Sequence, residues 1–312
     1  MGRGRRGIRG IGVQLVLVVI TLAPAPWGAA AQDATPDTTL RVARRGSQFL
    51  IPMGSMLAPG LGQYIHGAWG PGLAMTGSAL AGFALYGAKG GELLDDGLPR
   101  DADDQLGVSG ALLATGSAEL SAYDAFRRAV PDLQREGKYG FLTGQDATGD
   151  LFTAPFDPRF LRRWTTWVDL AETAVIVGVI LSEREEGVVY EPLKARDMGF
   201  ATVLSLSAGI GEEALFRGWL LPLFHETFGE RFWLANGLQA LLFGAGHIGS
   251  ASEFAAVIGA GALYEGWLTR RNDWSIRESI FHHFWYDVAV VTAEFLTDER
   301  SPVTLVFPTI RF

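Results

Sequence analysis

The chain has 312 residues, of which 48% are hydrophobic and 19% are charged, and its formal net charge at pH 7 is −8. It contains no cysteine, which excludes disulfides, thiolate metal ligands and a thiol nucleophile. The acidic balance, without a basic stripe interleaved with aromatic side chains, argues against a nucleic-acid partner. The charges are clustered and long windows carry almost none, so local hydropathy is more informative than the mean.

Residues 1–31 have the pattern of an export leader. Arginines at positions 3, 5, 6 and 9 precede an apolar core at 11–22, and small residues follow at 29–31. This is the order of a signal peptide and its cleavage site. The alternative is an uncleaved first membrane helix, and both interpretations direct the chain to a membrane.

Residues 32–125 contain two apolar segments rich in small residues, at 72–87 and 106–120. The turn Pro59-Gly60-Leu61-Gly62-Gln63 leads into the first, and the second ends in Ser121-Ala-Tyr-Asp-Ala. Glycine and alanine allow two membrane helices to approach closely. This region resembles the small bacterial two-helix membrane domains that begin with Pro-Gly-x-Gly-Gln and end in a Tyr-Asp-Ala signature. The resemblance names no activity. Residues 126–163 are a polar, basic-leaning linker that marks a predicted domain boundary.

Six apolar segments fill the domain predicted at 164–297, and a tail follows at 298–312. Several are shorter than the ~20 residues of a full bilayer crossing, which indicates tilted or interrupted helices packed around a polar cavity. The first carries Asp169 and Glu172 near one end. We therefore expect an all-α fold, a polytopic membrane helical bundle with about six to eight transmembrane helices. The segments are 164–181, 197–211, 219–229, 232–246, 254–268 and 279–296.

Polar side chains interrupt three of these segments. An ionisable group at membrane depth costs roughly 2.5–3.5 kcal/mol on insertion scales and is a functional hypothesis by default. Each motif taken alone is also compatible with a structural ion pair or a hydrogen-bonded pair, but together they indicate a shared polar cavity. The motifs are Glu212-Glu213-x-x-x-Arg217, Phe243-x-x-x-His247 and His283-x-x-x-Asp287.

The spacing assigns different faces to the two glutamates. Glu213 and Arg217 are four residues apart on a helix and share a face, with the acid first, which is the favoured order for an ion pair. Glu212 points about 100° away from its neighbour, given 3.6 residues per turn. His283 and Asp287 are again one turn apart on a shared face.

These motifs resemble those of the CPBP intramembrane proteases, also called the Abi or CAAX amino-terminal protease family. The family signatures are Glu-Glu-x-x-x-Arg, Phe-x-x-x-His and His-x-x-x-Asn/Asp, in that order on separate helices. The resemblance covers about 164–296 and implies a CAAX-protease-like core. It also implies that Glu212 is the general base that activates water, assisted by His247. His283 and Asp287 would face the scissile carbonyl and stabilise the oxyanion.

In the same resemblance, Glu213 and Arg217 would hold the first helix and orient Glu212. Asp287 departs from the commoner asparagine, and an ionised aspartate cannot donate to an oxyanion. Either burial keeps Asp287 protonated, or it accepts from His283 and holds that ring as the donor. We favour the second, because it keeps a cation near the developing negative charge.

The family has been described both as metalloproteases and as glutamate proteases. Glu212, His247 and His283 would furnish a three-ligand zinc site with an open position for water. The sequence lacks HExxH, and the pair His225-Glu226 has no second histidine to complete one. We favour a glutamate mechanism that requires no cofactor, with a divalent metal such as zinc as the alternative.

The sequence therefore predicts an intramembrane endopeptidase acting on a protein or peptide in the membrane, with lipid as its other partner. The expected location is the bacterial inner membrane, where prenylated CAAX proteins are not expected. The alternatives are a catalytically silent membrane scaffold or immunity-type protein, and a proton-coupled transporter that relays protons through the same groups. A transporter should show inverted repeats, and the two halves do not correspond.

Overall fold

The computed structural model describes residues 48–89, 98–182, 192–247 and 255–297. The predicted leader and tail lie outside these ranges. Every regular element in the described ranges is a helix, which confirms the all-α prediction. In chain order the elements are α3 (Leu50–Leu57), α4 (Leu61–Ile65), α5 (Trp69–Lys89), α6 (Ala102–Arg135), α7 (Thr148–Thr153), the 3-10 turns η1 (Ala154–Phe156) and η2 (Pro158–Arg162), α8 (Trp164–Ser182), α9 (Ala195–Glu213), the π-helix η3 (Ala214–Leu220), α10 (Leu221–Thr227), α11 (Phe232–Gly246), α12 (Ala255–Arg271) and α13 (Arg277–Thr297).

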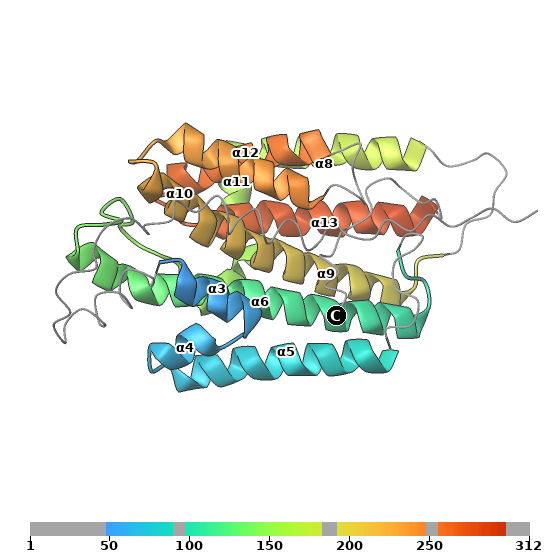
Figure 1. Cartoon of the computed structure of the whole chain (residues 1–312). Helices are drawn as coiled ribbons and strands as arrows, with labels where there is room; N and C mark the ends of the chain where they lie inside the picture. Colours follow the sequence, from blue (N-terminus) through green and yellow to red (C-terminus); the bar gives the residue numbers. More distant parts are fainter. Residues whose placement is uncertain (1–47, 90–97, 183–191, 248–254, 298–312) are drawn as a thin grey trace, which may run out of the picture.

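The long helices run side by side as a bundle (Figure 1). Helix α6 packs against both α5 and α9, and α13 packs against α8, α9 and α12. The apolar segments expected in the second half coincide with α8 to α13 within a few residues. Helix α6 continues without a break past position 126 to Arg135, and the domain limits stay a prediction.

Helices α5 and α6 meet through glycines. A side chain added at Gly82 would collide with the backbone at Gly110, and one added at Gly110 would collide with the backbone at Gly82. The small residues of these segments are therefore what the close helix crossing requires.

The Pro-Gly-x-Gly-Gln turn is held by the Ser121-Ala-Tyr-Asp-Ala segment in the middle of α6. Gly60 has a φ of 99°, which favours glycine, and its N–H donates to Ser121 Oγ at 2.8 Å. The Gln63 amide donates to the Ser121 carbonyl and to Asp124 Oδ2, both at 3.0 Å. The two signatures thus form one contact between segments about 60 residues apart.

One apolar core joins this N-terminal region to the rest of the chain. Ala122 and Phe126 of α6 belong to the same buried cluster as Leu215, Trp219 and Leu221 of the η3–α10 segment. The bundle therefore folds around α6.

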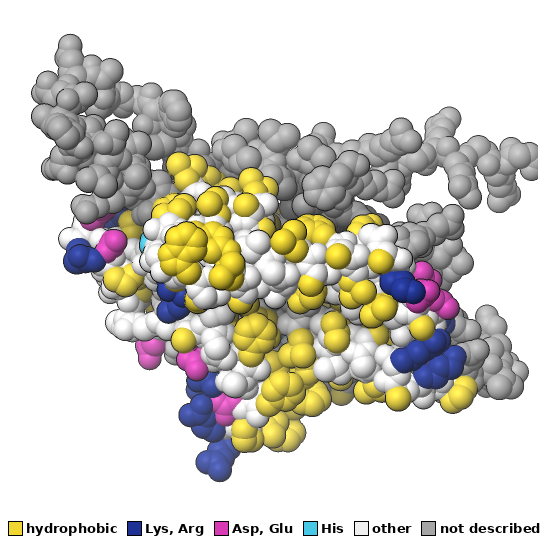
Figure 2. All heavy atoms as spheres, turned by 90° about the horizontal axis from the view of Figure 1, so that it is seen from below, with side chains coloured by type: hydrophobic (Ala, Val, Ile, Leu, Met, Phe, Trp, Pro, Cys, Tyr) yellow, Lys and Arg dark blue, Asp and Glu magenta, His cyan; other side chains and the backbone are white. Residues whose placement is uncertain are grey.

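Helix α8 is the one described helix that is long and apolar enough to cross a membrane, with a mean hydropathy of 1.4 over its best window. Apolar side chains also cover the middle of the molecular face in Figure 2, and charged side chains gather toward its two ends. The number of membrane crossings stays a prediction.

Candidate active site

The first motif lies where an α-helix widens into a π-helix. Glu213 is the last residue of α9, and Arg217 lies within η3, which runs directly into α10. Pro222 in α10 has no N–H and crowds the carbonyl four residues earlier, which favours a change of hydrogen-bond register just before it. Such π segments occur frequently at functional sites. The local sequence thus produces the irregular helix that carries the motif.

Glu213 is the buried centre of the cluster. Its Oε1 accepts from Arg217 Nη1 and from His283 Nδ1, both at 2.9 Å. Glu213 is 0% exposed and Arg217 is 1% exposed. The Arg217 guanidinium also lies 4.4 Å from the centre of the Phe243 ring, a cation–π geometry. The expected pair of Glu213 with Arg217 is present, and it extends to His283.

The other ring nitrogen of His283 faces the remaining carboxylates. His283 Nε2 lies 3.5 Å from Asp287 Oδ2 and 3.9 Å from Glu212 Oε2. Within the described residues, Asp287 Oδ2 is buried and has no hydrogen-bond partner. The side chain of Glu212 is 21% exposed, so this glutamate, unlike Glu213, retains access to the outside of the cluster.

His247 is linked to the cluster through Phe243. Its Nδ1 donates to the Phe243 carbonyl oxygen at 2.8 Å. The Phe243 ring lies 4.8 Å from the His247 ring and 6.2 Å from the His283 ring. Phe243 therefore contacts two predicted site residues and Arg217.

Glu119 of α6 is a further carboxylate at this site that the sequence analysis did not identify. It lies within electrostatic range of Glu212 and His283. Its Oε2 occupies the place where a side chain at Gly211 would begin, and Gly116 lies against the same glycine. An acidic residue at the end of the apolar segment 106–120 was the available signal, because buried charge in such a segment is costly.

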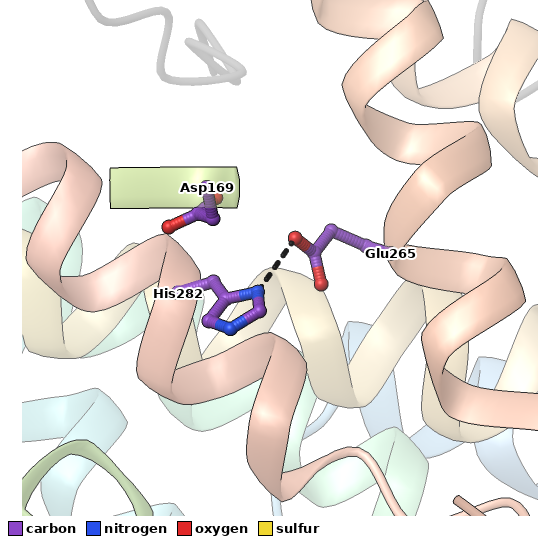
Figure 3. A group of neighbouring side chains, drawn as sticks. All are labelled: Asp169, Glu265 and His282. Carbon is purple, nitrogen blue, oxygen red and sulfur yellow. Dashed lines mark hydrogen bonds and ion pairs between the residues drawn. The ribbon is translucent and has the colours of Figure 1, made fainter. Parts of the chain in front are cut away.

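A second cluster of ionisable side chains lies between α8, α12 and α13 (Figure 3). Asp169, Glu265 and His282 each offer one ligand atom, and these atoms all lie within 4.8 Å of one another. Among the described residues this is the set whose spacing suits a metal ion, and it does not overlap the Glu212, His247 and His283 set expected from the sequence. The role of that expected set stays a prediction.

The fold and the cluster define a helical-bundle protein with a buried glutamate–histidine–aspartate site between its helices. Residues 194–289 match the family described as Type II CAAX prenyl endopeptidase Rce1-like. The match supports the resemblance of this segment to the CPBP/CAAX protease family that the motifs predicted. The match includes all three motifs and ends two residues after Asp287, and it does not include α3 to α8. No curated protein and no solved structure gives a match.

Proposed function

We propose that the chain is an intramembrane endopeptidase that hydrolyses a peptide bond of a membrane-associated protein or peptide. The family match supports a hydrolase of the protease type. The observation that carries the proposal is the contrast between the two adjacent glutamates. Glu213 is fully buried and bonded to Arg217 and His283, whereas Glu212 is partly exposed and lies 3.9 Å from His283 Nε2.

Glu212 acts as the general base in this proposal. It takes a proton from a water as the water oxygen attacks the scissile carbonyl carbon, and the carbonyl oxygen becomes an oxyanion. The tetrahedral intermediate collapses with cleavage of the C–N bond, and the proton held by Glu212 passes to the leaving amine. A water can donate to Glu212 Oε2 and accept from His283 Nε2, because an acceptor and a donor 3.9 Å apart can share one bridging water. His247, whose ring packs against Phe243 beside His283, assists Glu212.

His283 supplies the oxyanion donor. Its Nδ1–H is directed at Glu213, and Nε2 is surrounded by the carboxylates of Asp287 and Glu212. A neutral ring would turn a lone pair toward these carboxylates, so the imidazolium is favoured. Its Nε2–H is a charged donor beside the partly exposed Glu212, and Asp287 one turn away orients it.

A bilayer location is supported by the surface and by the family. Proteins of the Rce1-like family are membrane proteins. Helix α8 carries exposed Trp164, Trp167, Val168, Val175 and Val179, and a large exposed apolar surface indicates a partner or a membrane. Tryptophan is enriched at membrane–water interfaces. We propose a multi-pass protein of the bacterial inner membrane.

The decisive experiment compares Glu212→Gln with a control carboxylate variant. Glu172→Gln changes an exposed glutamate on α8, away from the cluster. Membranes from cells that contain wild type, either variant or no protein are compared by sequencing the new peptide termini. We expect termini that wild type and Glu172→Gln generate and Glu212→Gln does not. If Glu212→Gln generates the same termini at the wild-type rate, the proposed mechanism is wrong.

A further inference from the structure

Asp169, Glu265 and His282 come from three helices that are far apart in sequence, and their polar atoms converge (Figure 3). We propose that they bind one divalent transition-metal ion, such as Zn²⁺, which ties α8, α12 and α13 together beside the Glu212 cluster. This site shares no ligand with the proposed peptidase centre. The inference does not depend on the proposed function.

The spacing of the three groups is close to that of a metal site. Zinc bonds to nitrogen and oxygen are about 2.0–2.2 Å long, so two ligands of one tetrahedral ion are about 3.3–3.6 Å apart. His282 Nδ1 and Glu265 Oε1 are already 3.3 Å apart, and the three ligand atoms all lie within 4.8 Å of one another. A closing movement of at most about 1.5 Å therefore suffices to bring them onto one ion.

Two buried oxygens in the cluster have no other partner. Asp169 Oδ2 and Glu265 Oε2 are inaccessible to solvent and, within the described residues, accept no hydrogen bond. Glu265 as a whole is only 9% exposed. Buried polar atoms are nearly always satisfied, so an unsatisfied one requires an explanation such as an ion. One cation held by this cluster would explain both unsatisfied oxygens.

His282 is oriented as a metal-binding histidine would be. Its Nδ1 faces Glu265 Oε1 at 3.3 Å, which places this nitrogen inside the cluster. Its Nε2 lies 3.0 Å from Thr166 Oγ1 and 3.9 Å from Glu278 Oε1. Metal-ligating histidines almost always donate their second N–H to a hydroxyl, carbonyl or carboxylate acceptor, which fixes the tautomer. Thr166 Oγ1 is the acceptor within hydrogen-bond distance, and the Glu278 carboxylate adds negative charge on the same side.

Glu278 is itself held in place. It accepts from Asn272 Nδ2 at 2.5 Å, and it also accepts from Arg163 and Thr165. The carboxylate beside His282 Nε2 is therefore held by three other groups, which is the kind of outer support that metal sites have.

The ligand chemistry selects the class of cation. One imidazole with two carboxylates suits zinc and its neighbours in the first transition row, whereas Mg²⁺ and Ca²⁺ prefer oxygen ligands alone. On binding, the ion takes the Nδ1 lone pair and displaces any proton there to solvent. Because His283 follows His282 on α13 and points to a different face, the ion would also fix the rotation of α13 that directs His283 toward Glu213.

The test measures metal binding directly, on the full chain purified in detergent. The protein is stripped with chelator and dialysed against Zn²⁺, and the bound metal is counted by mass spectrometry. We expect one equivalent in wild type and a fall in affinity of more than about 100-fold in Asp169→Asn and His282→Gln, since loss of an outer-shell partner alone costs 10–100-fold. Thr166→Val tests that outer shell, with an expected weakening of about 10-fold.

The matched control is Glu212→Gln, which neutralises a carboxylate of the neighbouring cluster and should keep the full equivalent. If Zn²⁺ is lost from Glu212→Gln and kept by Asp169→Asn, the ion belongs to the other cluster and the proposal is wrong. If wild type binds no Zn²⁺, a metal-free imidazolium bonded to the two carboxylates replaces the proposal. Should the ligand variants fail to fold, the test is made on wild type with Co²⁺ in place of Zn²⁺, and bound Co²⁺ is detected by its visible absorption bands. If wild type shows neither bound Co²⁺ nor these bands, the proposal is equally wrong.

Discussion

Replacing Arg217 by methionine removes the charge that balances Glu213 while it keeps much of the buried side-chain volume. Arg217 Nη1 and Glu213 Oε1 are 2.9 Å apart, and both side chains are almost completely buried. Removing one partner of a buried ion pair typically costs about 3–5 kcal/mol, because the other charge stays buried without compensation. His283 still bonds to the same oxygen, so we expect the lower end, about 3 kcal/mol.

A second substitution separates this electrostatic cost from the loss of packing. In Glu213→Gln combined with Arg217→Met, no uncompensated carboxylate is left, and the glutamine carbonyl still accepts from His283 Nδ1. The double variant should therefore recover most of the loss, with a coupling of about 2 kcal/mol between the two sites. Removal of both members of a buried pair is often nearly neutral.

The assay is thermal unfolding of the purified variants in detergent. For a chain of this size, about 3 kcal/mol corresponds to a lowering of the midpoint by roughly 5 °C. The matched control is Arg135→Met, because Arg135 is 78% exposed at the end of α6 and pairs with Asp132. An exposed pair contributes about 1 kcal/mol or less. If Arg217→Met lowers the midpoint no more than Arg135→Met, the assignment of a costly buried charge is refuted.

Two further predictions concern a close helix contact and an ion pair outside the long helices. Gly211→Ala places a methyl group where the Glu119 carboxylate lies. We expect peptidase activity to fall about 100-fold, because a displacement of catalytic groups by about 1 Å has that effect. The control is Gly199→Ala on the same helix, which meets open space and should retain full activity. Hydrogen bonds from the Arg159 side chain hold the pKa of Asp157 at about 2. The ionised Asp157 therefore stabilises the fold fully above pH 4, near the pKa of an unfolded aspartate, and this stabilisation is lost as the pH falls through 2. The thermal unfolding midpoints of wild type and Asp157→Asn, measured along a pH series, should converge at low pH. A difference that stayed constant down to pH 2 would disprove this.

The helices were predictable because their signal is local. Apolar runs bounded by turn residues located α8 and α11 almost to the residue. The spacing of Glu213 and Arg217 predicted a shared helix face, and the ion pair follows from it. Both inferences need only the geometry of a single helix.

Contacts between helices were not predictable from such patterns. The spacing of apolar residues in the sequence predicts which face of a helix is buried, but it does not predict which other helix packs against that face. The sequence therefore did not indicate that Gln63 bonds to Ser121 and Asp124, or that His282 faces Glu265 while its neighbour His283 faces Glu213. The π-helix is likewise a response to Pro222 within a packed bundle, and its extent depends on that packing.

The N-terminal region is built into the site although the family match excludes it. Tyr123 of α6 lies against Gly218 of η3, and Glu119 lies against Gly211 of α9. These two glycines lie on either side of Glu212 and Glu213 in the sequence. Contact with α6 therefore fixes the position of the backbone that carries the two glutamates. The contact between the Pro-Gly-x-Gly-Gln turn and Ser121 and Asp124 in the middle of α6 in turn fixes that helix. The N-terminal region, whose signature names no chemistry, thereby contributes a wall and the Glu119 carboxylate to the proposed peptidase site.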